Sequence, residues 1–488
     1  MGSKNFRYLD DLIHSGANEI VLDSDIVLSN GERSKYLKGI KLDVDDLAID
    51  GNGHTINAQG KARIFCCTGK NITVKNIVLK NGFVEGYGGA IRIVSGEITI
   101  IRSILKGNTG KWGGAIYNDK GELTITESAL QENAARKYGG AIYNYSGGLA
   151  ITCSALTGNE AMDDGGAICN DDGELKITKS TLTGNTAQGY GGGAIKNKWG
   201  ELTIYDCELT ENTAQEWNGG AIYNGEGGRL TITGSTLARN TAEKYGGAIY
   251  NVEDGVLSIV SSALAGNTGK SDGGAIYNDG GELSIAVSAL NNNDAESGGA
   301  IYNDEDGKLS IVGSELKDNT GNWGGAIANF VDGELTITES RLNSNTAQTL
   351  GGAIENHAGK LSIAGSALNN NDAEFGGAIY SWGGEMTITQ SLLTGNMAKE
   401  EGGAIFNNSE LTINESKINN NMAEDGGAIS NFENGELAIA GSTLCENTAE
   451  RDGGAIFHSG NNDFDFKDCK FKDNKPDDIG KSEPMEDV

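Results

Sequence analysis

The sequence predicts a right-handed parallel β-helix, an all-β solenoid in which the chain winds through coils of three short strands. The first observation is a repeat, because the tetrapeptide Gly-Gly-Ala-Ile occurs fifteen times at spacings of 24 to 27 residues. A fixed period in this range is typical of stacked-repeat proteins. The second observation is that 74 of the 488 residues are Gly and only 2 are Pro. Few prolines leave the backbone free to form long hydrogen-bonded sheets, and many glycines suit tight turns.

The third observation is the pattern within one coil of about 26 residues. The distance from the Leu of Leu-Thr-Ile to the Asn of Asn-Thr-Ala is constant, as from Leu123 to Asn133. Apolar and polar residues alternate along this segment, so one face points inward. The Ile of Gly-Gly-Ala-Ile never varies, whereas the next position holds Lys196 in one coil and Glu355 in another. We therefore predict that this next position faces water.

Asparagine recurs at a fixed place in every coil, which indicates an architectural role, since an active site occurs once. Stacked at one strand spacing, asparagine side chains can hydrogen-bond to each other and to turn backbone. A second asparagine follows Gly-Gly-Ala-Ile-Tyr in most coils, as at Asn118 and Asn278, and lapses at Ser381 and His458. The first predicted ladder consists of Asn108, Asn133, Asn159, Asn185, Asn212, Asn240, Asn267, Asn293, Asn319, Asn345, Asn371, Asn396, Asn421, Asn447 and Asn474.

The two ends of the chain depart from the repeat. Phe6, Leu9, Leu12 and Ile13 lie at helical spacing, which predicts a short amphipathic helix over residues 4–14 that covers the first coil. We predict a cap with irregular first coils over residues 1–63 and the regular β-helix over residues 64–475. Residues 476–488 are predicted to be an acidic disordered tail.

Charge and hydropathy exclude several classes of partner. The formal net charge is -30, which repels nucleic acid and anionic membranes. No stretch of about 18 apolar residues occurs, so membrane insertion is not expected. The N-terminus shows no signal-peptide pattern. The cysteines are odd in number and irregularly spaced, which argues against a disulfide framework. We expect a monomer.

Aromatic residues recur in two rows, one after Gly-Gly-Ala-Ile and one before its glycine pair. Exposed rings on a rigid surface are good platforms for sugar rings or protein partners. The alternative is that the rings stack on each other and shield the sheet. The predicted ligand-binding residues are Trp112, Tyr138, Trp217, Tyr223, Tyr245, Tyr250, Tyr277 and Tyr302.

No catalytic residues are predicted. The regular coils contain two histidines, His357 and His458, and neither lies in a catalytic sequence context. Two aspartate pairs interrupt the repeat in adjacent variable loops, where Asp is a good turn residue. The alternative is that they are ligands of a structural Ca²⁺ ion, which prefers clustered oxygens. The residues of the two aspartate pairs are Asp163, Asp164, Asp171 and Asp172. No other cofactor is expected.

The Gly-Gly-Ala-Ile and Asn-Thr-Ala repeats resemble those of chlamydial polymorphic outer-membrane proteins. They are still more similar to the adhesin-like β-helix proteins of methanogenic archaea, as are Gly51–Ile56 and Asn71–Gly82. The likeness covers residues 5 to about 475. It implies a cell-surface or secreted scaffold that presents aromatic and acidic side chains to glycan or cell-surface protein ligands. Since β-helices also carry lyases and hydrolases, the alternative function is a polysaccharide-active enzyme.

Overall fold

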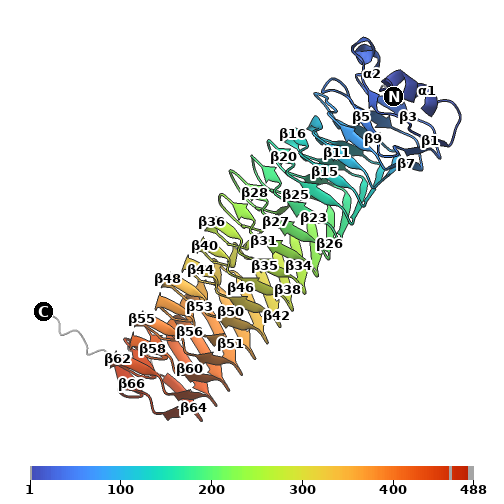
Figure 1. The fold of residues 1–488 in the computed structure, drawn as a ribbon. Coiled ribbons are helices and arrows are strands. Elements are labelled where there is room, and N and C mark those ends of the chain that lie inside the picture. The colour runs from blue at the N-terminus through green and yellow to red at the C-terminus, as the bar shows by residue number, and fades with distance from the viewer. Residues whose placement is uncertain (1–2, 461–463, 482–488) are drawn as a thin grey trace. The chain divides into compact units, whose positions relative to one another are not determined.

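The computed structural model describes residues 3–460 and 464–481, which divide into two compact units. Each unit is an all-β parallel solenoid of the predicted right-handed type, blue to green in Figure 1 for the first unit and yellow to red for the second. The first unit holds the residues up to Glu243, with Ala248–Tyr250 and Asp254–Val256, and the second holds Lys244–Gly247, Asn251–Glu253 and the residues from Leu257 onward.

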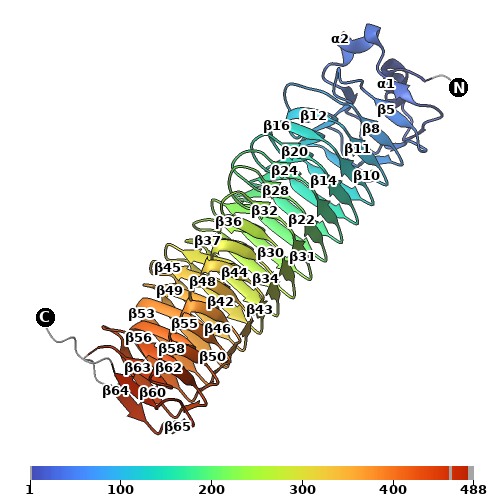
Figure 2. The ribbon, with the colours of Figure 1, turned by 60° about the vertical axis from the view of Figure 1, so that its left-hand side comes forward.

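A coil of the first unit shows how the repeat folds. Gly-Gly-Ala-Ile leads into β13 (Ile116–Asp119), and β14 (Glu122–Thr126), β15 (Ala129–Gln131) and β16 (Ala134–Tyr138) complete the coil. Strands β13 and β14 belong to one sheet, which we call the first sheet, and β15 and β16 belong to the second and third sheets. Each coil therefore contributes to three sheets, as predicted, and Figure 2 shows the successive rungs.

The main core consists of identical residues stacked in register. Ile116 pairs with Ile142, and Leu130 pairs with Leu156 in the next coil. These side chains are fully buried. Burial of one such side chain stabilises the fold by about 1.5–3 kcal/mol, and every added coil buries several of them. The alternation in the Leu-Thr-Ile segment is confirmed, since Leu123 and Ile125 of β14 are buried while Thr124 is exposed.

The asparagine ladder lies between the second and third sheets and is buried, fully so except at Asn474. The side-chain nitrogen of Asn133 donates to the side-chain oxygen of Asn159 at 3.0 Å, and its backbone N–H donates to the same oxygen at 3.1 Å. The side-chain nitrogen also donates to the Leu105 carbonyl at 3.0 Å. The ladder asparagines therefore bond to their stacked neighbours and also to a backbone carbonyl, that of a leucine or, for Asn447, that of Ile418, so the buried amide has several partners.

A second asparagine ladder closes the turn between the two strands of the first sheet. Asn118 donates to Asn144 at 2.7 Å and to the Gly121 carbonyl at 2.8 Å. At Ser381 and His458, where the asparagine lapses, another polar group takes its place. Asn356 donates to the Ser381 hydroxyl at 3.3 Å, and Asn431 lies 3.2 Å from the Nδ1 atom of His458.

The first unit begins with the helix that the sequence predicts. Helix α1 spans Phe6–Ile13, and the side chain of Asn5 caps it by accepting from the Tyr8 backbone N–H at 3.1 Å. Phe6, Leu9 and Ile13 are buried on one face of the helix, which contacts β2 (Ile26–Val27) and β3 (Ile40–Leu42). The helix thus covers apolar residues of the first coils.

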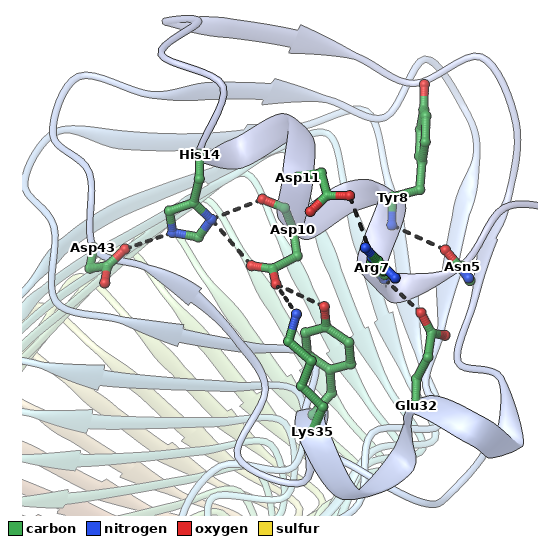
Figure 3. A network of polar contacts seen from close by, with 10 residues as sticks. Asn5, Arg7, Tyr8, Asp10, Asp11, His14, Glu32, Lys35 and Asp43 are labelled. Carbon is green, nitrogen blue, oxygen red and sulfur yellow. Dashed lines mark hydrogen bonds and ion pairs between the residues drawn. The ribbon is translucent and has the colours of Figure 1, made fainter.

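A polar network fastens α1 to its surroundings (Figure 3). The ring of His14 contacts the Asp10 carbonyl oxygen at 2.8 Å and the Asp43 carboxylate at 2.9 Å. The Asp10 carboxylate also accepts from Lys35 at 3.1 Å and from the Tyr36 hydroxyl at 2.8 Å. The Asp43 contact raises the pKa of His14 above its ordinary value, and the Asp10 carbonyl adds to this effect.

The second unit ends with β63 (Ile456–His458), β64 (Phe464–Lys467), β65 (Lys470–Lys472) and β66 (Ile479–Lys481). Strand β66 pairs with β63, although it falls within the stretch that the sequence predicts to be a disordered tail. Residues 482–488 of that stretch lie outside the described residues. No described helix combines the length and the apolar character needed to cross a membrane.

Candidate functional site

Two columns of side chains lie outside the main core, at the corner formed by the glycine pair. The outer column holds the residue after each Gly-Gly-Ala-Ile, and the front column holds the residue before each glycine pair. Gly113 shows why the corner needs glycine, because its φ is +66° and an added Cβ would lie 2.0 Å from the Ile116 carbonyl oxygen. This tight turn brings the front column over the outer column.

Most rings of the outer column are stacked and buried. Tyr117 stacks on Tyr143 with centroids 5.4 Å apart, and Tyr277 stacks on Tyr302 at 4.9 Å. Trp112 and Tyr138 of the front column pack against the first pair, and together they form a small apolar cluster of their own. This arrangement matches the alternative in which the rings shield the sheet.

The prediction that the outer column faces water was wrong. Cys169, Ala328 and Glu355 all occupy this column and are buried, Glu355 with only 3% of its surface exposed. The physical reason is the corner turn, which folds the front column over positions that point away from the main core.

The exposure of the predicted ligand-binding residues follows from this layering. Trp217 is exposed, while Tyr250 and Tyr277 are buried. The remaining members are partly buried: Trp112, Tyr138, Tyr223, Tyr245 and Tyr302.

In both columns the aromatic residues give way to other residue types at the same place in the first unit. The outer column runs through Tyr143 and is then interrupted by Cys169 and Lys196. The front column changes to Asp164, Gly191 and Asn218, which are bridged to one another in successive coils. A repeat that breaks in two neighbouring columns at once marks a special place on the surface, and we call this region the polar break.

The coils at the polar break also carry an insertion. The distance from the alanine of the third-sheet strand to the alanine of Gly-Gly-Ala-Ile is seven residues from Ala187 to Ala194 and from Ala214 to Ala221. The preceding coil has six residues here, from Ala161 to Ala167. The extra residue in each coil displaces one ring outward, after the short third-sheet strands β24 (Thr186–Ala187) and β28 (Thr213–Ala214).

The two displaced rings are Tyr190 and Trp217. They stack with centroids 5.9 Å apart and an interplanar angle of 26°. Tyr190 is 64% exposed and Trp217 is 37% exposed. The sequence suggests that they belong to the row of Trp112 and Tyr138, but the bridges place Gly191 and Asn218 in that row instead. The longer spacing between the two alanines was the signal that could have revealed this difference.

An ion pair between a partly buried lysine and a buried aspartate lies in the polar break. The Lys196 Nζ atom donates to the Asp164 carboxylate at 2.7 Å and lies 4.9 Å from the centre of the Tyr223 ring. Burial is the largest single effect on the pKa of Lys196 and lowers it, but the charge of Asp164 and the hydrogen bond to it together raise it by more, so this pKa lies above its ordinary value. The lysine therefore stays charged.

Two buried oxygen atoms in the polar break have no hydrogen-bond partner among the described residues. They are the second carboxylate oxygen of Asp164 and the side-chain oxygen of Asn218. Each belongs to a residue at least nine-tenths buried. An unsatisfied buried acceptor costs about 1–3 kcal/mol, and a hydrogen-bond donor would recover part of that cost. The polar break thus combines an exposed ring pair with two buried, unpaired acceptor oxygens.

The four aspartates considered as calcium ligands have other partners. Asp164 pairs with Lys196, and Asp171 accepts from the Tyr143 hydroxyl at 2.6 Å. Asp172 accepts from Ser146 at 3.1 Å, and Asp163 lies 3.9 Å from Lys137. Within the described part of the chain, no group of three or more His, Cys, Asp or Glu side chains is placed to hold a metal ion.

The two histidines of the regular coils have structural contacts. His357 stacks on Phe330 with centroids 5.4 Å apart. His458 is buried and continues the second asparagine ladder at Asn431. All seven cysteines are free thiols.

Comparisons with known proteins add little to this geometry. No protein-family model matches the chain, and no curated protein matches it. Among solved structures, one described as a PL6 family alginate lyase matches with 8% identity over 99% of this chain and 98% of the other. Its TM-score is 0.21, so the likeness carries no argument about activity.

Proposed function

We propose that the chain is an adhesin-like binding scaffold at a cell surface, and that the Tyr190–Trp217 pair of the polar break contacts a glycan. The observation that carries the proposal is that the two inserted residues of neighbouring coils are both aromatic, exposed and stacked on each other. The fold does not need them, because the other coils of the repeat form without this insertion.

The chemistry of the site suits a sugar. Aromatic rings offer flat apolar surfaces with fixed geometry, on which the C–H faces of a pyranose ring can lie, and each ring contributes about 0.5–1.5 kcal/mol by analogy with aromatic pairs. Asp164 and Asn218 add polar side chains to the same region, with their unpaired oxygens buried beneath the surface. Since the chain carries a net charge of -30, the favoured glycan is neutral or cationic.

A glycan microarray tests this proposal. The purified chain should bind a defined set of neutral or amino glycans. The double variant Tyr190→Ala, Trp217→Ala should bind them at least tenfold more weakly, about 1.4 kcal/mol. The matched control is Tyr205→Thr, because Tyr205 is an exposed ring on β26 (Glu201–Tyr205) whose register neighbours Thr178 and Thr233 are already threonines.

Three results would count against the proposal. They are no binding by the parent, equal loss in the Tyr205→Thr control, or unchanged binding in the double variant. Release of product from a polysaccharide panel would favour the alternative, a polysaccharide-active enzyme. Thermal melts of all variants establish that each one is folded.

A further inference from the structure

The second unit has a groove on the outer face of its third sheet, with a volume of about 600 Å³. Its lining comes from neighbouring strands, several of which are labelled along one face in Figure 2. These strands are β48 (Thr346–Leu350), β52 (Asp372–Phe375), β55 (Met397–Glu401), β58 (Met422–Asp425) and β62 (Thr448–Asp452).

Strand alternation explains the shape of the groove. The alanine in each strand, such as Ala373 or Ala398, is buried on the inner face. The residues on either side of it point outward and form two rows, with the backbone of the sheet as the floor between them. The first row contains Thr346, Asp372, Met397 and Met422, and the second contains Gln348, Glu374, Lys399, Glu424 and Glu450.

Two methionines in the first row depart from the repeat. Eight of the fifteen coils have Asn-Thr here, whereas two consecutive coils have Asn-Met. Met397 and Met422 are paired in register and are 47% and 46% exposed. Methionine adapts to varied apolar surfaces and is common at peptide-binding sites. The two exposed methionines form an apolar patch at positions where eight other coils have the hydroxyl group of a threonine.

The walls of the groove are acidic. Asp372, Glu374, Glu424 and Glu450 face a single cation of the lining, Lys399. Arg451 pairs with Glu424 at 3.1 Å, but among the described residues no ion pair reaches Asp372 or Glu374. Burial raises the pKa of Asp372, as expected for a carboxyl group without a cation.

We propose that this groove binds an extended peptide segment that is rich in lysine and carries apolar side chains. The five strands span about 19 Å at a strand spacing of about 4.8 Å, which matches about six residues of an extended chain. Lysines would approach the acidic walls, and apolar side chains would contact Met397 and Met422. A second copy of this chain is disfavoured as the occupant, because its net charge is also -30.

Fluorescence anisotropy on the full chain tests the proposal with a labelled eight-residue peptide of alternating Lys and Leu, at physiological salt. The variant Met397→Thr, Met422→Thr restores the residue found in most other coils, so its fold should be retained. We expect it to bind at least fivefold more weakly. Glu374→Gln should weaken binding at least threefold and reduce its dependence on salt.

Matched controls separate the groove from general attraction to an acidic protein. Met162→Thr removes an exposed methionine of the first unit, and Glu334→Gln removes an exposed carboxylate from β46 (Glu334–Thr338). Neither should change the affinity. Equal weakening by the controls, or no binding by the parent, would overturn the proposal.

A companion peptide of alternating Lys and Ser should bind more weakly and should be insensitive to the methionine substitutions. If it binds as tightly as the Lys-Leu peptide, or if a chitosan oligomer competes equally well, the groove is not a peptide site. This inference is independent of the Tyr190–Trp217 pair, so either proposal can fail alone.

Discussion

The polar break of the first unit has a counterpart in the second unit. The two regions differ in whether the titratable side chain in the outer column has a partner of opposite charge. In the first unit, Lys196 in the outer column pairs with Asp164 in the front column. In the second unit, the outer column of rings is interrupted by Ala328 and Glu355, with Leu350 in the front column. No hydrogen-bond partner of the Glu355 Oε2 atom occurs in the described ranges.

The comparison shows that the same corner can hold an ion pair or a neutral acid. The Asp164 carboxylate holds Lys196 in its charged form, because its attraction outweighs the effect of burial. Burial raises the pKa of Glu355 to about 8, so this residue is mostly protonated at neutral pH. The position of a titratable residue in the repeat thus determines how far it is buried. The residue that the neighbouring coil places beside it determines whether it is charged.

The largest expected effect is the loss of the cation in the first unit. Lys196→Met leaves the buried Asp164 carboxylate alone, which should destabilise the unit by about 3–5 kcal/mol at neutral pH. Urea denaturation measures this change. Lys198→Met is the control, because Lys198 pairs with Glu226 at a more exposed site and should cost below about 1 kcal/mol.

A second substitution, at Asp164, should recover most of the stability that Lys196→Met loses. Adding Asp164→Leu to Lys196→Met removes the unpaired carboxylate, so the double variant should be more stable than Lys196→Met alone. If the single variant matches the parent, the ion pair is not buried in solution and the comparison fails.

The neutral acid of the second unit should show itself through pH. The folded-state pKa of Glu355 lies above its ordinary value of 4.5, at about 8. The folded state therefore holds the proton more tightly, and stability should fall as pH rises from about 4.5 to about 8, by about 2–4 kcal/mol. Glu355→Gln should remove this part of the pH dependence. The same slope in Glu355→Gln as in the parent would show that another group is responsible.

The smallest expected effect is at the cap, where the charges are exposed. The raised pKa of His14 means that its contribution is fully present below about pH 6.5 and is lost as pH rises through the folded-state pKa. Solvent screening keeps this contribution below about 1 kcal/mol. His14→Gln should therefore lower the melting temperature slightly at pH 5.5 and leave it unchanged at pH 9. An equal drop at both pH values would indicate lost packing instead.

The sequence predicts the parts of the molecule that repeat. Leu123 and Asn133 keep a constant spacing in every coil, and constant spacing shows directly which residues stack. The burial of Glu355 could not be inferred in this way, because a column that tolerates both Lys and Glu looks like a solvent-facing one. Only the path of the chain at the corner shows that the front column covers it.

The candidate site was predicted only in part, because Trp217 is among the predicted ligand-binding residues and Tyr190 is not. Tyr190 and Trp217 look like members of the front column when rings alone are compared, but the count of residues between Ala187 and Ala194 separates them. The ion pair of Lys196 and Asp164 joins residues 32 positions apart, on two different columns. Pairs of that kind depend on the folded corner and leave no local pattern in the chain.

The first asparagine ladder has a direction, which affects how the number of coils can change. In the second unit, each side-chain amide donates to the amide of the following coil, from Asn267 to Asn474. The series ends where Asn474 donates to the Asp478 carboxylate at 2.8 Å. A carboxylate only accepts, so it terminates a chain of donors without leaving one unpaired. Whole coils can therefore be duplicated or deleted upstream while the same terminator still fits, and the length of such a chain can drift in steps of one coil.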